Sequence, residues 1–117
     1  MDTTKIFNLG HRCFYFSREV ILFVKECEYP RVFSSIFNQV IRSATSIGAN
    51  IVEGGSGSSR KDWKNFYVIA LKSANETKYW LCLIKDIVRK DEEIEKLLKE
   101  VNELSKIIAS IILKANK

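Results

Sequence analysis

The chain has 117 residues, of which 46% are hydrophobic and 28% charged, and its formal net charge is +5. This length suffices for a hydrophobic core, so residues 1–117 are expected to form a single domain. No apolar run is long enough to span a bilayer and no signal peptide is visible, which predicts a cytoplasmic protein with no membrane partner.

The cysteines and the histidine argue against a metal site. Cys13, Cys27 and Cys82 form no CxxC pair, and the single histidine, His11, has no partner at metal-ligand spacing. The cysteines are therefore expected to be buried side chains in a reducing compartment. We predict no metal and no cofactor.

Catalysis is not expected either. The Glu-x-x-His pair of di-iron bundles is missing, and one histidine provides no convincing pair of nucleophile and base. Asn50, Glu53 and Glu76 supply amide and carboxylate groups, which we expect to cap helices or to bridge subunits. No catalytic residue is predicted, and the protein is expected not to be an enzyme.

Apolar residues at steps of three and four predict a first helix from Phe7 or Asn8 to Glu28. Pro30 ends this helix, because the residue before a proline is pushed out of the α region. Its core stripe comprises Leu9, Cys13, Phe16, Val20, Val24 and Cys27, widened by Phe14, Ile21 and Phe23.

A second helix is predicted from Arg31 or Val32 to Glu53. Gly48 lies in a run of small residues within it and marks either a kink or a close contact, since glycine inside a helix costs about 1 kcal/mol relative to alanine. The core stripe of this helix comprises Phe33, Phe37, Val40, Ala44, Ile47 and Ile51.

The glycine- and serine-rich residues 54–58 connect this helix to a third. They lack the Lys-Ser/Thr pair of a phosphate-binding loop, and no strand precedes them, so we interpret them as a plain helix connection. The third helix is predicted to begin with the capping box Ser59-x-x-Asp62 and to end near Lys90.

A fourth helix follows Asp91, a favourable N-cap, and acidic residues in its first turn complement the helix dipole. Its core positions are Ile94, Leu97, Val101, Leu104, Ile108 and Ile111. Four helices with short connections and no convincing strand predict an all-α fold, an antiparallel up-down-up-down four-helix bundle.

The third helix carries most of the positive charge, because residues 59–90 contain eight basic and three acidic side chains. On a helical wheel of about 100° per residue, one arc is apolar and is predicted to face the core. This predicted core arc comprises Trp63, Phe66, Ile69, Ala70, Ala74, Trp80, Leu81, Ile84, Ile87 and Val88.

The opposite arc of the third helix mixes cations with apolar side chains, and two interpretations follow. A nucleic-acid surface would use the cations for phosphates and the tyrosines for stacking. A subunit interface would bury the apolar residues under the lysine stems. The candidate nucleic-acid-binding residues are Arg60, Lys61, Lys64, Lys72, Lys78, Lys85 and Arg89. The candidate interface residues are Tyr67, Val68, Leu71, Tyr79 and Cys82.

Three segments carry a family resemblance. They are the run from Arg42 to Gly54, the pair Asp62-x-x-x-Phe66, and the run from Ala70 to Glu76. Together they resemble the four-helix bundle proteins encoded in intervening sequences of bacterial 23S ribosomal RNA genes, to which accessory proteins of diversity-generating retroelements are similar. The resemblance extends over residues 7–115, and glycine stands at position 48 where the family commonly has proline.

The resemblance implies an antiparallel bundle that assembles into a ring-like homopentamer and has no known catalysis. For the retroelement branch it also implies binding to nucleic acid and to a reverse transcriptase. We therefore predict a non-enzymatic, self-assembling adaptor whose basic surface binds RNA or DNA. The alternative is a purely structural scaffold for protein interaction with no affinity for nucleic acid.

Overall fold

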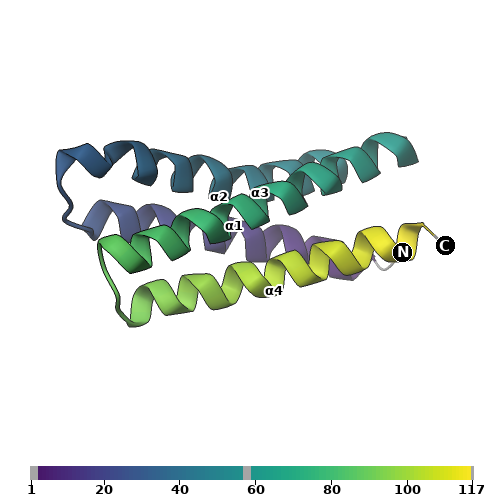
Figure 1. Cartoon of the computed structure of the whole chain (residues 1–117). Helices are drawn as coiled ribbons and strands as arrows, with labels where there is room; N and C mark the ends of the chain where they lie inside the picture. Colours follow the sequence, from purple (N-terminus) through teal and green to yellow (C-terminus); the bar gives the residue numbers. More distant parts are fainter. Residues whose placement is uncertain (1–2, 57–58, 117) are drawn as a thin grey trace.

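Four helices make up the computed structural model, which describes residues 3–56 and 59–116 (Figure 1). They are α1 (Thr3–Glu26), α2 (Ser34–Gly54), α3 (Arg60–Ile87) and α4 (Glu92–Ala115), and a short 3-10 helix, η1 (Arg31–Phe33), precedes α2. These described residues contain no strand. The predicted all-α, four-helix fold is therefore confirmed.

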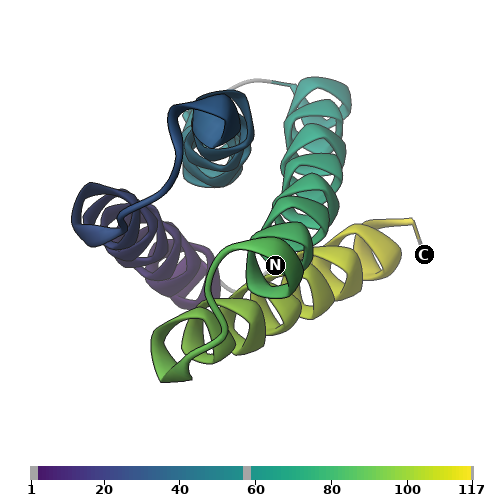
Figure 2. The same ribbon diagram turned by 60° about the vertical axis from the view of Figure 1, so that its left-hand side comes forward.

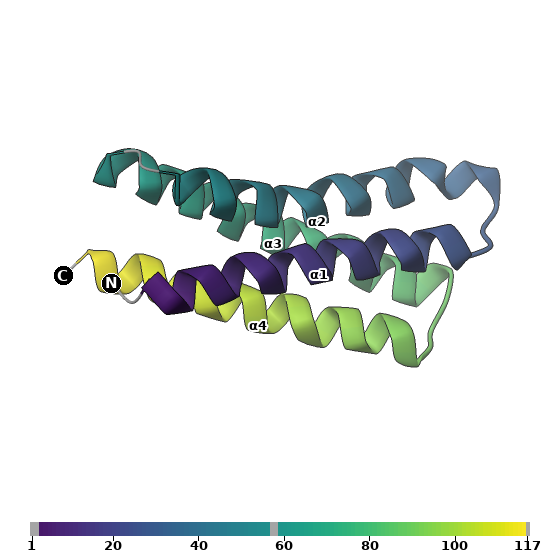
Figure 3. The same cartoon turned by 180° about the vertical axis from the view of Figure 1, so that it is seen from behind.

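The helices pack in a closed cycle in which α1 neighbours α2, α2 neighbours α3, α3 neighbours α4, and α4 neighbours α1 (Figure 2). Ser43 and Ser46 of α2 hydrogen-bond Thr77 and Ser73 of α3, respectively, so these two helices run in opposite directions. Figures 1 and 3 show the same reversal at each connection. The start of α1, the end of α2, the start of α3 and the end of α4 consequently lie at one end of the bundle (Figure 1).

Side-chain caps set the starts of α3 and α4. The Ser59 hydroxyl accepts a hydrogen bond from the Asp62 N–H, and the Asp91 carboxylate accepts one from the Ile94 N–H. Each bond satisfies a backbone donor that the first helical turn leaves unpaired. Both caps lie where the sequence predicts them, whereas α1 begins earlier than expected, at Thr3, and ends at Glu26.

The core is a set of seams in which buried positions alternate at steps of four and three along each helix. On α3 this seam comprises Trp63, Tyr67, Ala70, Ala74, Thr77, Leu81 and Ile84. The predicted stripe of α4 is buried as expected. Such spacing keeps one narrow face turned inward along each helix, which is the packing of coiled coils and helix bundles.

Two glycines let α2 approach its neighbours closely. A Cβ added to Gly48 would lie 3.1 Å from the Cβ of Cys13 on α1. One added to Gly54 would lie 3.0 Å from the Cβ of Phe66 and 3.2 Å from the ring of Tyr67, both on α3. Of the two predicted roles for Gly48, the structure shows the close contact.

The predicted faces of α1 and α3 need correction. Tyr67, expected on the outer face of α3 as an interface residue, is completely buried, and its ring stacks on Trp63 at 4.6 Å. Ile69 and Ile87, expected in the core, are 45% and 44% exposed. The buried seam repeats every 3.5 residues, so a wheel of 3.6 residues per turn drifts by about 20° per heptad over this long helix.

The same correction applies elsewhere. On α1, Phe14 and Ile21 lie outside the core, although the sequence analysis places them at its margin. Trp80 on α3 is half-buried. Cys13 and Cys27 are buried as predicted, whereas Cys82 is exposed. Bulky apolar side chains thus remain on the surface of all four helices, since Val52 of α2 and Leu113 of α4 are exposed as well.

The contact at Gly54 is a test of this packing. We expect Gly54→Ala to lower the free energy of unfolding by about 1–3 kcal/mol, because the new methyl group overlaps Phe66 and Tyr67. The measurement is urea denaturation followed by circular dichroism.

Gly55→Ala is the matched control. An added Cβ there would meet atoms no nearer than 3.6 Å, and the φ of −82° suits any residue. This variant should match the wild type or gain up to about 1 kcal/mol. Equal destabilisation by both substitutions would contradict the proposed role of the close contact.

Candidate nucleic-acid interface

Three of the seven candidate cations are held by groups of the same chain. Arg60 donates to the carbonyl oxygen of Ala115 at 2.6 Å, which ties the start of α3 to the end of α4. Lys85 forms an ion pair with Glu95 of α4. These contacts reduce the capacity of both cations to meet an external phosphate.

Arg89 is the third. It forms an ion pair with Asp91 and a longer one, of 3.7 Å, with Glu93, and its guanidinium lies 5.3 Å from the ring centre of Phe23 on α1. The hydrogen bond from the Ile94 N–H, with that from Arg89, lowers the pKa of Asp91. The Asp91 hydrogen bond raises the pKa of Arg89. Arg89 therefore stabilises the turn between α3 and α4 through these contacts.

Four of the predicted cations, Lys61, Lys64, Lys72 and Lys78, make no ion pair within residues 3–56 and 59–116. The first three are exposed and Lys78 is half-buried. Their charge is available to an external anion.

The position of two of these lysines follows from the Lys85–Glu95 ion pair. Lys64, Leu71 and Lys78 precede Lys85 at heptad spacing, so they share the edge of α3 that borders α4. Leu71, a predicted interface residue, lies half-buried between the two lysines. This edge is therefore basic with an apolar centre.

Two further lysines, which the sequence analysis missed, lie on α4. Lys99 and Lys106 follow Glu95 by four and eleven residues, which places them next to Glu95 on the outward face of α4, opposite its buried seam. Both are exposed and neither makes an ion pair in the part of the chain that the structure describes. We call Lys64, Lys78, Lys99 and Lys106 the α3–α4 cationic face.

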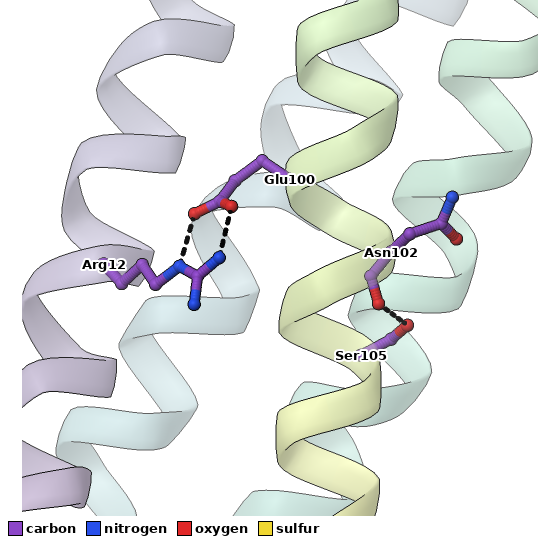
Figure 4. Close-up of polar contacts among 4 residues, drawn as sticks. All are labelled: Arg12, Glu100, Asn102 and Ser105. Atoms are coloured by element: carbon purple, nitrogen blue, oxygen red, sulfur yellow. Dashed lines mark hydrogen bonds and ion pairs between the residues drawn. The ribbon is translucent and has the colours of Figure 1, made fainter.

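The opposite groove, between α1 and α4, differs in charge. Arg12 donates to both carboxylate oxygens of Glu100 at 2.8 Å each (Figure 4). This contact raises the pKa of Arg12. Figure 4 also shows the Ser105 hydroxyl donating to the Asn102 carbonyl of the same helix, at 3.0 Å. Because the Arg12 charge is neutralised, it adds little to the basic surface.

The remaining predicted interface residues stay on the surface. Val68 is half-buried, Tyr79 is 62% exposed, and Cys82 is exposed. Tyr67 is thus wrongly placed, Val68 packs partly against the core, and the interface role of the other four residues stays a prediction.

Two of the three residues considered for chemistry, Asn50 and Glu76, have side-chain contacts within the protein. Asn50 donates to the Ser46 carbonyl at 2.8 Å, and Glu76 accepts a hydrogen bond from the Trp80 indole at 3.2 Å. Burial raises the pKa of the Cys13 thiol to about 12, so it is a poor nucleophile. Nothing in this arrangement points to catalysis.

A metal site would need clustered ligands within the described ranges, 3–56 and 59–116. They hold no group of three or more His, Cys, Asp or Glu side chains able to bind a metal ion. None of their helices is long and apolar enough to cross a membrane.

Comparison with known proteins places this bundle in a family. The model of the 23S rRNA-intervening sequence protein family matches residues 8–110. The chain belongs to this family. The match includes all the lysines of the α3–α4 cationic face, and it confirms the resemblance seen in the sequence. No functionally curated protein matches the chain.

A solved structure supports the same assignment. The chain is 32% identical to a protein of unknown function from the S23 ribosomal protein family of Bacteroides thetaiotaomicron, with a TM-score of 0.79. The similarity covers 92% of this chain and 97% of that one. The 23S rRNA-intervening sequence family thus supplies the fold, while the function of this relative is itself unknown.

The Asp91 cap predicts a response to acid. Its folded-state pKa is lowered, so its contribution to stability is present above the ordinary carboxyl pKa and is lost as the pH falls through the folded-state value. We expect the free energy of unfolding to fall below about pH 4, in part through this residue.

Asp91→Asn keeps a capping side chain but cannot titrate. Urea unfolding between pH 2 and pH 7 should show a shallower acid decline in this variant. Superimposable pH profiles for the wild type and the variant would contradict the assigned role of Asp91.

Proposed function

We propose that this family member is a non-enzymatic, self-assembling bundle that binds nucleic acid through the α3–α4 cationic face. The observation that carries the proposal is that lysines with no ion pair among the described residues gather on the neighbouring surfaces of α3 and α4. The α1–α4 groove, by contrast, has its Arg12 charge neutralised by Glu100. Lysine side chains that lack internal partners are suited to phosphates, which they contact as mobile point charges.

The proposal concerns backbone recognition rather than base reading. Lysines release counterions from the phosphates, so affinity should fall by about 0.9 log units per tenfold rise in salt for each neutralised phosphate of a duplex. The apolar centre at Leu71 and the exposed ring of Tyr79 add contact area. Tyr79 offers a flat ring to an unpaired base, for which stacking contributes about 1–3 kcal/mol.

The first test uses Lys64→Ala combined with Lys78→Ala. Binding of a DNA duplex and of a structured RNA is measured by fluorescence anisotropy at several salt concentrations. For the duplex, the double variant should bind more weakly and its salt slope should fall by up to about 1.8, as two phosphate contacts are lost.

The control combines Lys96→Ala with Lys114→Ala. It also removes two positive charges, but from positions on α4 outside the α3–α4 cationic face. This control should keep the wild-type slope. Equal effects of the two double variants, or no binding by the wild type at low salt, would contradict the proposal. Absence of binding together with stable assembly would favour the alternative, a purely structural scaffold.

We also propose that the protein assembles into a homopentamer, as the family resemblance implies, and that a ring presents the cationic face several times. Exposed apolar side chains support assembly, because single-domain monomers rarely leave contiguous apolar patches without a function. A protein partner, such as the reverse transcriptase of the retroelement branch, would bind to the assembled form.

Light scattering after size-exclusion chromatography tests the assembly. The expected mass is five times the 13.5 kDa of one chain. Addition of RNA should raise this mass further. A mass of one chain at micromolar concentration would contradict self-assembly.

A further inference from the structure

An outward row on α1 alternates basic or imidazole side chains with apolar ones. It follows steps of three and four residues, so its members share one face of the helix. Phe14 is 65% and Ile21 is 44% exposed, which leaves large apolar groups at the centre of the row. We call the row the α1 stripe; it comprises His11, Phe14, Arg18, Ile21 and Lys25.

A hollow lies beside the α1 stripe, between α1 and the end of α2. It has a volume of about 500 Å³ and is lined by Phe14, Tyr15 and Val52 over the backbones of Gly10 and Gly55. Val52 is 64% exposed. The lining is thus largely apolar, and it includes two residues without side chains, Gly10 and Gly55.

Gly10 lines this hollow, and no close contact with the described residues of its own protomer requires a glycine there. A Cβ added there would meet nothing within 4 Å, unlike those at Gly48 and Gly54. Glycine inside a helix destabilises it relative to alanine, and no neighbouring helix offsets that cost here. The space in front of Gly10 suits a group that approaches the α1 backbone from another molecule.

A second row lies on α3, along the edge that borders α2, and its members range from the buried Ser73 to the exposed Ile69. Ser73, within this row, hydrogen-bonds Ser46 of α2 and fixes its position. The charged members of the row are acidic, and Trp80 packs edge-on against Tyr79 at 5.1 Å. We call the row the α3 stripe; apart from Ser73, it comprises Asp62, Phe66, Ile69, Glu76, Trp80 and Ile87.

We propose that a second copy of this chain docks its α3 stripe onto the α1 stripe and its adjoining hollow. Both rows have the four-three spacing that helices use to interlock side chains. Their charges are complementary, since the α1 stripe carries Arg18 and Lys25 and the α3 stripe carries Asp62 and Glu76. Opposite charges bordering an apolar seam favour this pairing over α1 with α1 or α3 with α3.

The outer face of α2 fits the same arrangement. The α1 and α3 stripes flank α2 on its two sides, so they meet at a corner of the bundle rather than lying opposite each other. When each copy binds the next through two different faces, and these faces lie at an angle, the repeated rotation can close the copies into a small ring. α2 would then face the ring axis, with an outer face that combines the small side chains of Thr45 and Ala49 with the exposed Arg42.

This inference rests on the self-assembly in the proposed function and adds the surfaces that meet. It leaves the α3–α4 cationic face on the outside of the ring, away from α2. Nucleic-acid binding and assembly would therefore use separate surfaces of one protomer.

The experiment uses two variants of the full chain, each with one stripe disabled. Phe14→Glu blocks the α1 stripe and Ile69→Glu blocks the α3 stripe, and both positions are solvent-exposed, so the fold should persist. Each variant alone is expected to have the mass of a monomer in light scattering. An equimolar mixture should form a heterodimer through the one pair of intact stripes.

Leu113→Glu is the matched control. Leu113 is 64% exposed, nearly as much as Phe14, but it lies on α4 outside both stripes. This variant should keep the native mass. If either stripe variant loses its helical circular dichroism, Ile21→Glu and Ile87→Glu replace the pair at the same stripes.

The outcomes separate this pairing from the proposed function. A wild-type oligomer whose two variants form no heterodimer on mixing would overturn the pairing while leaving self-assembly intact. An oligomer retained by Ile69→Glu but lost by Phe14→Glu would indicate contact between two α1 stripes and would also overturn it. A monomeric wild type would overturn the pairing and self-assembly together, whereas the binding test on Lys64 and Lys78 is judged separately.

Discussion

The close approach of α2 to both of its neighbours is the constraint on which the bundle depends. Gly48 accommodates the Cys13 side chain and Gly54 accommodates Phe66 and Tyr67. Buried hydroxyl groups lie at the same contact, because the Thr77 hydroxyl is within hydrogen-bond distance of the Ser43 hydroxyl across the interface, at 2.9 Å, and of the Ser73 carbonyl of its own helix, at 2.7 Å. Small side chains thus bring the backbones together without leaving those hydroxyls unpaired, and the large rings of α3 fill the remaining space.

Much of the fold could be predicted from local patterns. The caps at Ser59 and Asp91 and the four-three stripe of α4 are short-range signals, and the structure has them where expected. The inward face of α3 was predicted less well, because a wheel of 3.6 residues per turn drifts against the 3.5-residue seam and places Tyr67 outside and Ile69 inside. Burial follows the neighbouring helix rather than the size of the side chain, and the sequence of one helix does not contain that neighbour.

The candidate site shows the same division between local and tertiary information. Segregation of lysines along α3 is visible in the sequence, but their pairing is not. Lys85 is paired with Glu95, a residue of the next helix, and only the register of α3 against α4 brings Lys99 near the lysines of α3. The net charge of a segment therefore overstates the charge that it offers to a partner.

Because the bundle has an even number of helices, the start of α1 and the end of α4 lie at the same end. The end of α2 and the start of α3 lie at that end too (Figure 1). The other end carries η1 and the turn between α3 and α4, which Arg89 stabilises. Copies related by rotation about an axis along the bundle would all point the same way. Such an assembly has polarity: its two rims differ in chemistry, so a partner that recognises one rim is bound in a single orientation.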